Sequence, residues 1–108
     1  MRVTLMYFES CRSWTLTYER LSALASELGF ELERRKVRTA EEAEQAGFRG
    51  SPTILVDGRD PFADGEEQVG GLACRVYQTL KGPAGTPSQQ QLRDVLTARL
   101  NESTFADH

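Results

Sequence analysis

Hydrophobic residues follow two different spacings in the first third of the chain. Residues 3–8 are apolar or β-favouring at every position, which predicts a strand buried on both faces. Further along, Leu21, Leu24 and Leu28 recur at intervals of three and four residues, the spacing of a buried helix face. Gly29 follows the last of these leucines and predicts the end of that helix.

The next stretch predicts an edge strand and a short helix. Residues 30–37 alternate at first and then become charged, which is typical of a strand at or near the edge of a sheet. Thr39 and Glu42 have the spacing of a capping box, in which the threonine side chain caps the new helix. We therefore expect a helix over about residues 40–46, ended by Gly47.

The second half of the chain predicts two more strands and a closing helix. Residues 53–56 are β-favouring, and residues 72–77 form a plausible strand that pairs back on them. Residues 59–70 and 82–87 are rich in glycine, proline and acidic residues, and we expect them to form loops. A second capping box over residues 88–91 then opens a helix with a leucine-rich face.

This order of elements predicts an α/β fold. The first strand, helix and second strand form a βαβ unit, which requires parallel neighbours and a right-handed crossover. With the predicted hairpin, the expectation is a four-stranded mixed sheet with about three helices on both faces. At 108 residues, the chain is long enough for one domain over residues 1–100, and we expect residues 101–108 to form a frayed tail.

Charge and hydropathy exclude several classes of partner. The chain has 13 basic and 16 acidic residues, a net charge of −3, which gives no electrostatic reason to bind nucleic acid or an anionic membrane. The basic cluster over residues 34–38 is largely cancelled by acidic neighbours, so we interpret it as a solvated sheet edge. No apolar stretch approaches the roughly 20 residues of a membrane span. The N-terminus lacks the features of a signal peptide, and we expect a cytoplasmic protein.

The two cysteines carry the chemistry that the sequence offers. Cys11 and Cys74 are too few for a disulfide framework or, by themselves, for a structural zinc site. The one histidine is the terminal His108, so no catalytic pair can be built on an internal histidine. We expect no resident cofactor and no metal site.

Cys11 lies where the first strand turns into the first helix, with Ser10 or Ser13 as the expected helix cap. A thiol at a helix N-terminus feels the positive end of the helix dipole, which lowers a cysteine pKa below its usual value of about 8.5. The neighbouring Arg12 adds to this effect and Glu9 opposes it. Cys11 is therefore a candidate nucleophile.

Cys74 has two interpretations. On a strand beside residues 53–57 it is either a small core residue or a distant resolving thiol for Cys11. A simple hairpin would place it near the middle of that strand and not beside Pro52. Two thiolates could also hold a soft cation such as Hg(II) or Cu(I).

These features together resemble the thioredoxin-like fold over residues 2 to about 100. The resemblance rests on the element order, on Cys11 at the first strand-to-helix turn and on the Ser51-Pro52-Thr53 segment that opens the third strand. It implies that Pro52 is a cis-proline facing Cys11. It also implies that this segment binds substrate, with the backbone of Ser51 offering hydrogen bonds to an extended thiol substrate.

The sequence departs from the usual family motif at one position. Thioredoxins use Cys-x-x-Cys, whereas this chain has Cys11-Arg12-Ser13-Trp14, so tryptophan replaces the resolving cysteine. The chain is more similar to small bacterial thioredoxin-family proteins with a Cys-Pro-Asn-Trp motif, often described as alkylmercury-lyase-like. The resemblance to these proteins lies in residues 48–53, 60–63 and 72–77. Trp14 either packs on the 53–57 strand and shields Cys11, or stacks on substrate.

The sequence thus predicts a thiol redox or thiol-binding protein. If it is an enzyme, the expected class is a thiol–disulfide oxidoreductase. Cys11 would be the nucleophile and Cys74 the resolving thiol. The partner would be a low-molecular-weight thiol or a protein thiol or disulfide. One alternative is a soft-metal or alkylmercury-lyase-like module that uses both cysteines, although no acid stands three residues after Cys11. Another is a redox-inactive interaction domain.

Overall fold

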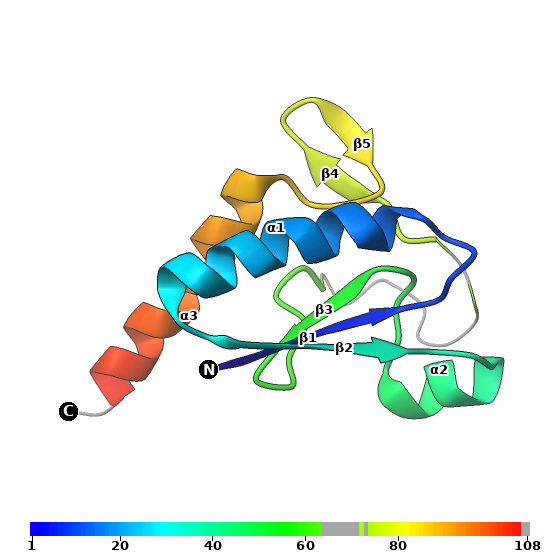
Figure 1. Cartoon of the computed structure of the whole chain (residues 1–108), viewed down its shortest axis with the longest axis horizontal. Helices are drawn as coiled ribbons and strands as arrows, with labels where there is room; N and C mark the ends of the chain where they lie inside the picture. The colour runs from blue at the N-terminus through cyan, green and yellow to red at the C-terminus, as the bar shows by residue number, and fades with distance from the viewer. Residues whose placement is uncertain (64–71, 73, 107–108) are drawn as a thin grey trace.

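The computed structural model describes residues 1–63, 72 and 74–106 of the chain. Figure 1 shows an α/β arrangement in which a small sheet lies between helices, with a separate hairpin beside the longest helices. The elements in chain order are β1 (Arg2–Tyr7), α1 (Ser13–Leu28), β2 (Glu31–Lys36), α2 (Ala40–Ala46), β3 (Thr53–Val56), β4 (Tyr77–Thr79), β5 (Gly82–Ala84) and α3 (Gln89–Ala106).

The main sheet has the order β2-β1-β3. Strand β1 is central, parallel to β2 and antiparallel to β3, and Val3 lies opposite Leu32 on one side and Val56 on the other. The predicted central strand and the predicted charged edge strand are both confirmed. The parallel pair joined through α1 is the expected βαβ unit.

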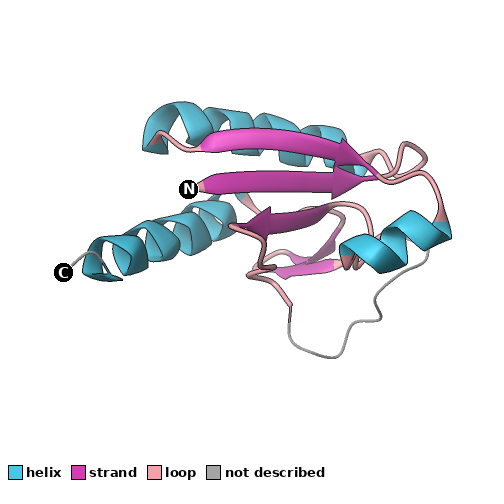
Figure 2. Cartoon of the chain, turned by 90° about the horizontal axis from the view of Figure 1, so that it is seen from below, coloured by secondary structure: helices cyan, strands magenta, loops and turns pink. Residues whose placement is uncertain are grey.

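Helices cover both faces of this sheet because its strand residues alternate between two cores (Figure 2). Val3 and Leu5 of β1 point toward α1 and α3, whereas Met6 points toward α2. The first core also contains Leu21, Leu24, Phe30, Ile54, Val56, Leu92 and Leu96. The second contains Val37, Ala43 and Phe48.

The predicted threonine cap of α2 and the complete capping box of α3 are confirmed, whereas the Glu42 side chain accepts from the Arg38 N–H at 2.9 Å and not from the Thr39 N–H. The Thr39 hydroxyl accepts a hydrogen bond from the Glu42 backbone N–H at 3.1 Å and caps α2. The Ser88 hydroxyl accepts from the Gln91 N–H at 3.1 Å, and the Gln91 side chain accepts from the Ser88 N–H at 2.8 Å. Helix α3 then continues to Ala106, so it includes six residues that were expected to lie in a frayed tail.

The predicted four-stranded thioredoxin-like sheet is wrong. Among the described residues, the main sheet has three strands, and β4 and β5 form a separate two-stranded sheet. At the outer edge of β3, Arg59 pairs with Val56 in place of the expected fourth strand. The chain turns back at residues 57–58, and Val56 and Arg59 exchange two backbone hydrogen bonds of 2.7 and 3.1 Å. This closes part of the edge to which residues 72–77 were expected to add.

The β4–β5 hairpin includes residues that we expected to form a loop. Thr79 and Gly82 face each other across a two-residue connection, and Gly82 has a φ of +103° that favours glycine. The Thr79 hydroxyl closes the turn by donating to the Gly82 carbonyl at 2.7 Å. The predicted loop over residues 59–70 begins with turns, and residues 64–70 of it lie outside the described residues.

None of the helices in the described part of the chain combines the length and apolar character needed to cross a bilayer.

Candidate functional site

The two cysteines meet although 63 positions separate them in sequence. Cys11 and Cys74 form a disulfide with a Cα–Cα distance of 5.8 Å, within the ordinary range for such bonds. A turn after β1 positions Cys11, whose N–H donates to the Phe8 carbonyl at 3.2 Å. An isolated parallel bridge to Ser51 positions Cys74. Cys74 therefore lies beside Pro52 and not at the middle of β3, which corrects the placement expected from a simple hairpin.

Helix α1 begins directly after this disulfide. Its N-cap is Arg12, which makes no side-chain capping hydrogen bond, so neither expected serine cap is correct. Ser13 cannot cap because it is already the first helical residue, and its hydroxyl faces Gly85. The first turn contains no acidic residue to offset the positive end of the helix dipole. Negative charge on Cys11 would therefore be favoured at this position.

The loop that opposes the disulfide contains a cis peptide bond between Ser51 and Pro52, the isomer that the family resemblance implies. The Ser51 carbonyl accepts a hydrogen bond from the Arg75 N–H at 3.0 Å. Its hydroxyl accepts from the Phe8 N–H at 3.2 Å. The chain's own segment around Cys74 thus occupies the backbone group that we expected to bind an extended substrate.

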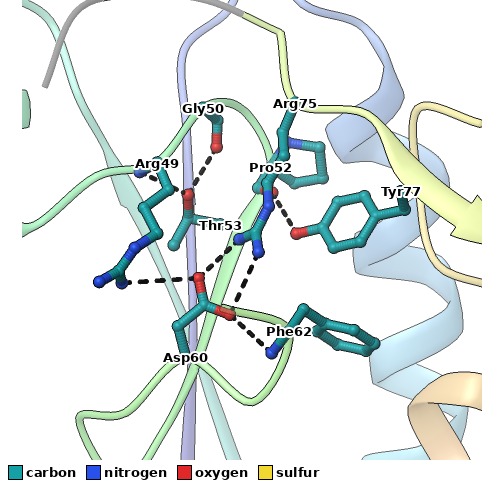
Figure 3. A network of polar contacts seen from close by, with 8 residues as sticks. All are labelled: Arg49, Gly50, Pro52, Thr53, Asp60, Phe62, Arg75 and Tyr77. Atoms are coloured by element: carbon teal, nitrogen blue, oxygen red, sulfur yellow. Dashed lines mark hydrogen bonds and ion pairs between the residues drawn. The ribbon is translucent and has the colours of Figure 1, made fainter. Parts of the chain in front are cut away.

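Pro52 and Thr53 are buried and hold the loop together. The Pro52 carbonyl accepts from the Tyr77 hydroxyl at 2.6 Å. The Thr53 hydroxyl donates to the Gly50 carbonyl at 2.6 Å and accepts from the Arg49 N–H at 3.1 Å (Figure 3). In the oxidised protein, these predicted substrate-binding residues bind other parts of the same chain.

Trp14 packs against the first core and stacks on a neighbouring aromatic ring. Its ring stacks on Tyr7 of β1 with a centroid distance of 4.0 Å, and the Arg34 guanidinium lies 5.8 Å from the ring centroid. The core against which Trp14 packs includes Ile54 and Val56 of β3, and its role as a shield for Cys11 or as a substrate-stacking ring stays a prediction. Trp14 remains half-buried.

A buried ion pair anchors the segment that carries Cys74. The side chains of Arg75 and Asp60 are 5% and 1% exposed, and the guanidinium contacts the carboxylate at 2.6 and 3.5 Å. The Phe62 N–H donates to the same carboxylate at 2.9 Å, and the Tyr77 ring centroid lies 4.6 Å from the Arg75 guanidinium carbon. Figure 3 shows Arg75 reaching between Asp60 and Tyr77.

Sequence reasoning missed Asp60 and Arg49 as parts of this site. A second guanidinium, that of Arg49, lies 3.9 Å from the Asp60 carboxylate. The signal that could have revealed them was the resemblance of residues 60–63 and 72–77 to small bacterial thioredoxin-family proteins. Each of these two segments contributes one member of the buried ion pair. Charge alone does not reveal the pairing, because acidic residues are common in the surrounding loop.

The two ends of the disulfide differ in exposure. Cys11 is 4% exposed, whereas Cys74 is an exposed residue. Cys74 also lines a pocket of about 450 Å³ together with Arg49, Phe62 and Tyr77. An incoming thiol would therefore meet the Cys74 end of the bond first.

The geometry of this site supports metal binding less well than disulfide exchange. Within the described ranges, no three His, Cys, Asp or Glu side chains gather as potential ligands, so the two cysteines of the lyase-like alternative have no third such ligand beside them there. After reduction, the two sulfurs alone could offer the linear coordination that soft cations accept.

Comparisons with known proteins add no relative to this description. No family model matches the chain, and no curated protein or solved structure matches it. The family resemblance drawn from the motifs therefore stays a prediction.

Proposed function

We propose that the chain is a cytoplasmic thiol–disulfide exchange protein whose working group is the Cys11–Cys74 disulfide. The observation that carries the proposal is the asymmetry of this bond, with one cysteine buried at a helix N-terminus and the other exposed beside a pocket. Disulfides in reducing compartments are usually transient and catalytic or redox-sensing. Exposed disulfides are also more readily reduced than buried structural ones.

The geometry favours roles opposite to those expected from sequence. An external thiolate attacks the Cys74 sulfur, a mixed disulfide forms there, and the electron pair of the broken bond goes to Cys11. The helix N-terminus stabilises the departing Cys11 thiolate, which makes Cys11 the better leaving group. In the reverse direction, the Cys11 thiolate resolves a mixed disulfide on Cys74, as a local Cys-x-x-Cys partner would.

Adduct mapping tests this assignment. The oxidised protein is treated with 2-mercaptoethanol, quenched with an alkylating reagent, and analysed by intact mass and peptide mapping. We expect the mercaptoethanol adduct on Cys74 and the alkyl group on Cys11. In a matched pair of variants, Cys11→Ser should form the adduct with hydroxyethyl disulfide about tenfold faster than Cys74→Ser, because Cys74 is the accessible thiol.

Two outcomes would contradict the proposal. An adduct found mainly on Cys11 would reverse the assigned roles. A disulfide that stays intact under conditions that fully reduce a small-molecule disulfide would make it structural, and the chain would then be a redox-inactive interaction domain.

A second candidate function is soft-metal binding by the reduced pair, favoured by the 5.8 Å separation of the two Cα atoms. Titration of the reduced protein with Hg(II) or Cu(I) distinguishes it. One-to-one binding that is lost in Cys11→Ser and in Cys74→Ser, together with a mixed-disulfide yield near zero, would favour this function over exchange.

A further inference from the structure

We infer that the pocket beside Cys74 selects a small thiol that carries a carboxylate, with Arg49 as the residue that binds the carboxylate. The inference rests on the proposed exchange function and names the substrate class for the same site. The pocket is lined by Cys74, by the two arginines Arg49 and Arg75, and by the rings of Phe62 and Tyr77. Its volume of about 450 Å³ suits a small molecule rather than a folded partner.

The charges around this pocket favour an anion. Of the described side chains there, Arg49 and Arg75 contribute two positive charges, and Asp60 contributes one negative charge. Asp60 makes its short contact, at 2.6 Å, with Arg75, whereas its contact with Arg49 at 3.9 Å is beyond hydrogen-bonding distance. Arg49 is therefore an incompletely satisfied cation at the edge of the pocket.

The hydrogen bonding of Arg49 supports the same conclusion. Its Nε is buried and has no hydrogen-bond partner among the residues that the structure describes. Its side chain is 27% exposed, so the guanidinium remains within reach of solvent and of a ligand. A guanidinium with unused donors is well matched to a carboxylate, which can accept two parallel hydrogen bonds.

A thiolate bound in this pocket would reduce the disulfide in two steps. A bound thiolate attacks the Cys74 sulfur, the Cys11–Cys74 bond breaks, and Cys11 leaves with the electron pair. A second thiolate then attacks the outer sulfur of the mixed disulfide and releases the small-molecule disulfide, and Cys74 keeps the electron pair. In balance, two thiols are oxidised to one disulfide, the protein disulfide is reduced to two thiols, and the two protons of the substrate thiols pass to the cysteines.

Thiols that differ in charge test this inference. The oxidised protein is reduced by 3-mercaptopropionate, 2-mercaptoethanol or cysteamine, compared at equal thiolate concentration, and the appearance of free protein thiols is followed in time. We expect 3-mercaptopropionate to react about fivefold faster than the neutral thiol, although the net charge of −3 on the chain would by itself repel an anion. Cysteamine should show no such advantage.

Arg49→Gln should remove the preference for the anionic thiol, so that the ratio of the rates with 3-mercaptopropionate and 2-mercaptoethanol falls to about one. Arg38→Gln is the matched control, because Arg38 is exposed, lies outside the pocket and carries the same charge. The control should keep the preference.

The outcomes separate the two proposals. Equal rates for the three thiols, or an unchanged preference in Arg49→Gln, would overturn the inference and leave the exchange function intact. Failure of all three thiols to reduce the disulfide would overturn the exchange function itself.

Discussion

At the scale of single residues, the site depends on one buried carboxylate. Asp60 binds the Arg75 guanidinium and the Phe62 N–H while its side chain is 1% exposed. Arg75 directly follows Cys74, so this ion pair fixes the backbone next to the disulfide. A buried ion pair contributes little net stability relative to apolar residues, but the loss of one partner leaves an uncompensated charge.

We therefore expect Asp60→Asn to lower the free energy of unfolding by about 3–5 kcal/mol. The substitution keeps the shape of the side chain and removes only the charge that faces Arg75. Urea denaturation of the oxidised protein measures the change, with Asp94→Asn on the exposed face of α3 as the control. A loss no larger than that of the control would contradict the assigned role of Asp60.

A second carboxylate, Asp57, predicts a pH dependence. The backbone N–H of Arg2 donates to it at 2.9 Å, and with the Arg99 guanidinium it holds the pKa of the Asp57 carboxyl below its usual value. Burial acts in the opposite direction. A carboxyl with a lowered folded-state pKa stabilises the fold above its unfolded pKa of about 3.9, and this contribution is lost as the pH falls through the folded value.

Asp57→Asn should consequently be less stable than the wild type at neutral pH, and the difference should shrink as the pH falls below about 4. Asparagine suits this position because residue 57 has a φ of +50°, which asparagine tolerates. Urea denaturation across the acidic range measures the difference. A gap that stays constant with pH would show that the Asp57 charge is not responsible.

At the scale of elements, the segment around Cys74 approaches the cis-proline loop closely because residue 50 is glycine. Gly50 has a φ of +109°, and a Cβ atom there would lie 2.9 Å from the Arg75 Cβ and 3.1 Å from its backbone N. A side chain at this position would push residues 74–75 away from Ser51. The bridge that positions Cys74 therefore requires this glycine.

Gly50→Ala should destabilise the protein more than Gly47→Ala, by about 1–3 kcal/mol. Gly47 is the matched control, since its φ is +71° but a Cβ there would contact nothing within 4 Å. Re-formation of the Cys11–Cys74 disulfide in a defined redox buffer should also slow in Gly50→Ala alone. Equal effects of the two substitutions on stability and on re-formation would exclude the proposed close approach.

The elements fixed by local signals were predictable from sequence. The apolar run of β1, the capping residues Thr39 and Ser88, and the terminating Gly29 each determine structure within a few neighbours, and the structure confirms them. The position of residues 72–77 depends instead on contacts between residues distant in sequence. The Val56–Arg59 turn closes part of the β3 edge. The buried Arg75–Asp60 ion pair holds the Cys74 segment beside Ser51, at the other end of β3.

The candidate site was likewise predictable only where local signals determine it. Cys11 and the Ser51–Pro52 segment were identifiable because each occupies a recognisable turn. The meeting of Cys11 and Cys74 was one of several possibilities, because a distance between residues 63 positions apart is set by tertiary packing. Arg49 was overlooked because nothing in its local sequence distinguishes it from other arginines, and its role depends on the pocket around it.

At the scale of the whole molecule, the disulfide closes a loop over most of the chain. In the chain-entropy model, a cross-link across 63 positions restricts the unfolded state and stabilises the fold by about 4 kcal/mol. Reduction should therefore lower the free energy of unfolding by about 2–4 kcal/mol. Urea denaturation with and without reductant tests this, and the Cys11→Ser/Cys74→Ser double variant, insensitive to reductant, serves as the control. Identical stability in both redox states would contradict the expected coupling between redox state and fold.

The central claim is that Cys11–Cys74 is an exchanging bond and not a structural one. Equilibration in thiol–disulfide buffers of graded potential, followed by alkylation and intact mass, measures it most directly. We expect a reversible two-electron transition, seen as a gain of two alkyl groups, between about −180 and −300 mV. A bond that stays oxidised well below about −300 mV, or cysteines that never pair in the most oxidising buffer, would contradict it.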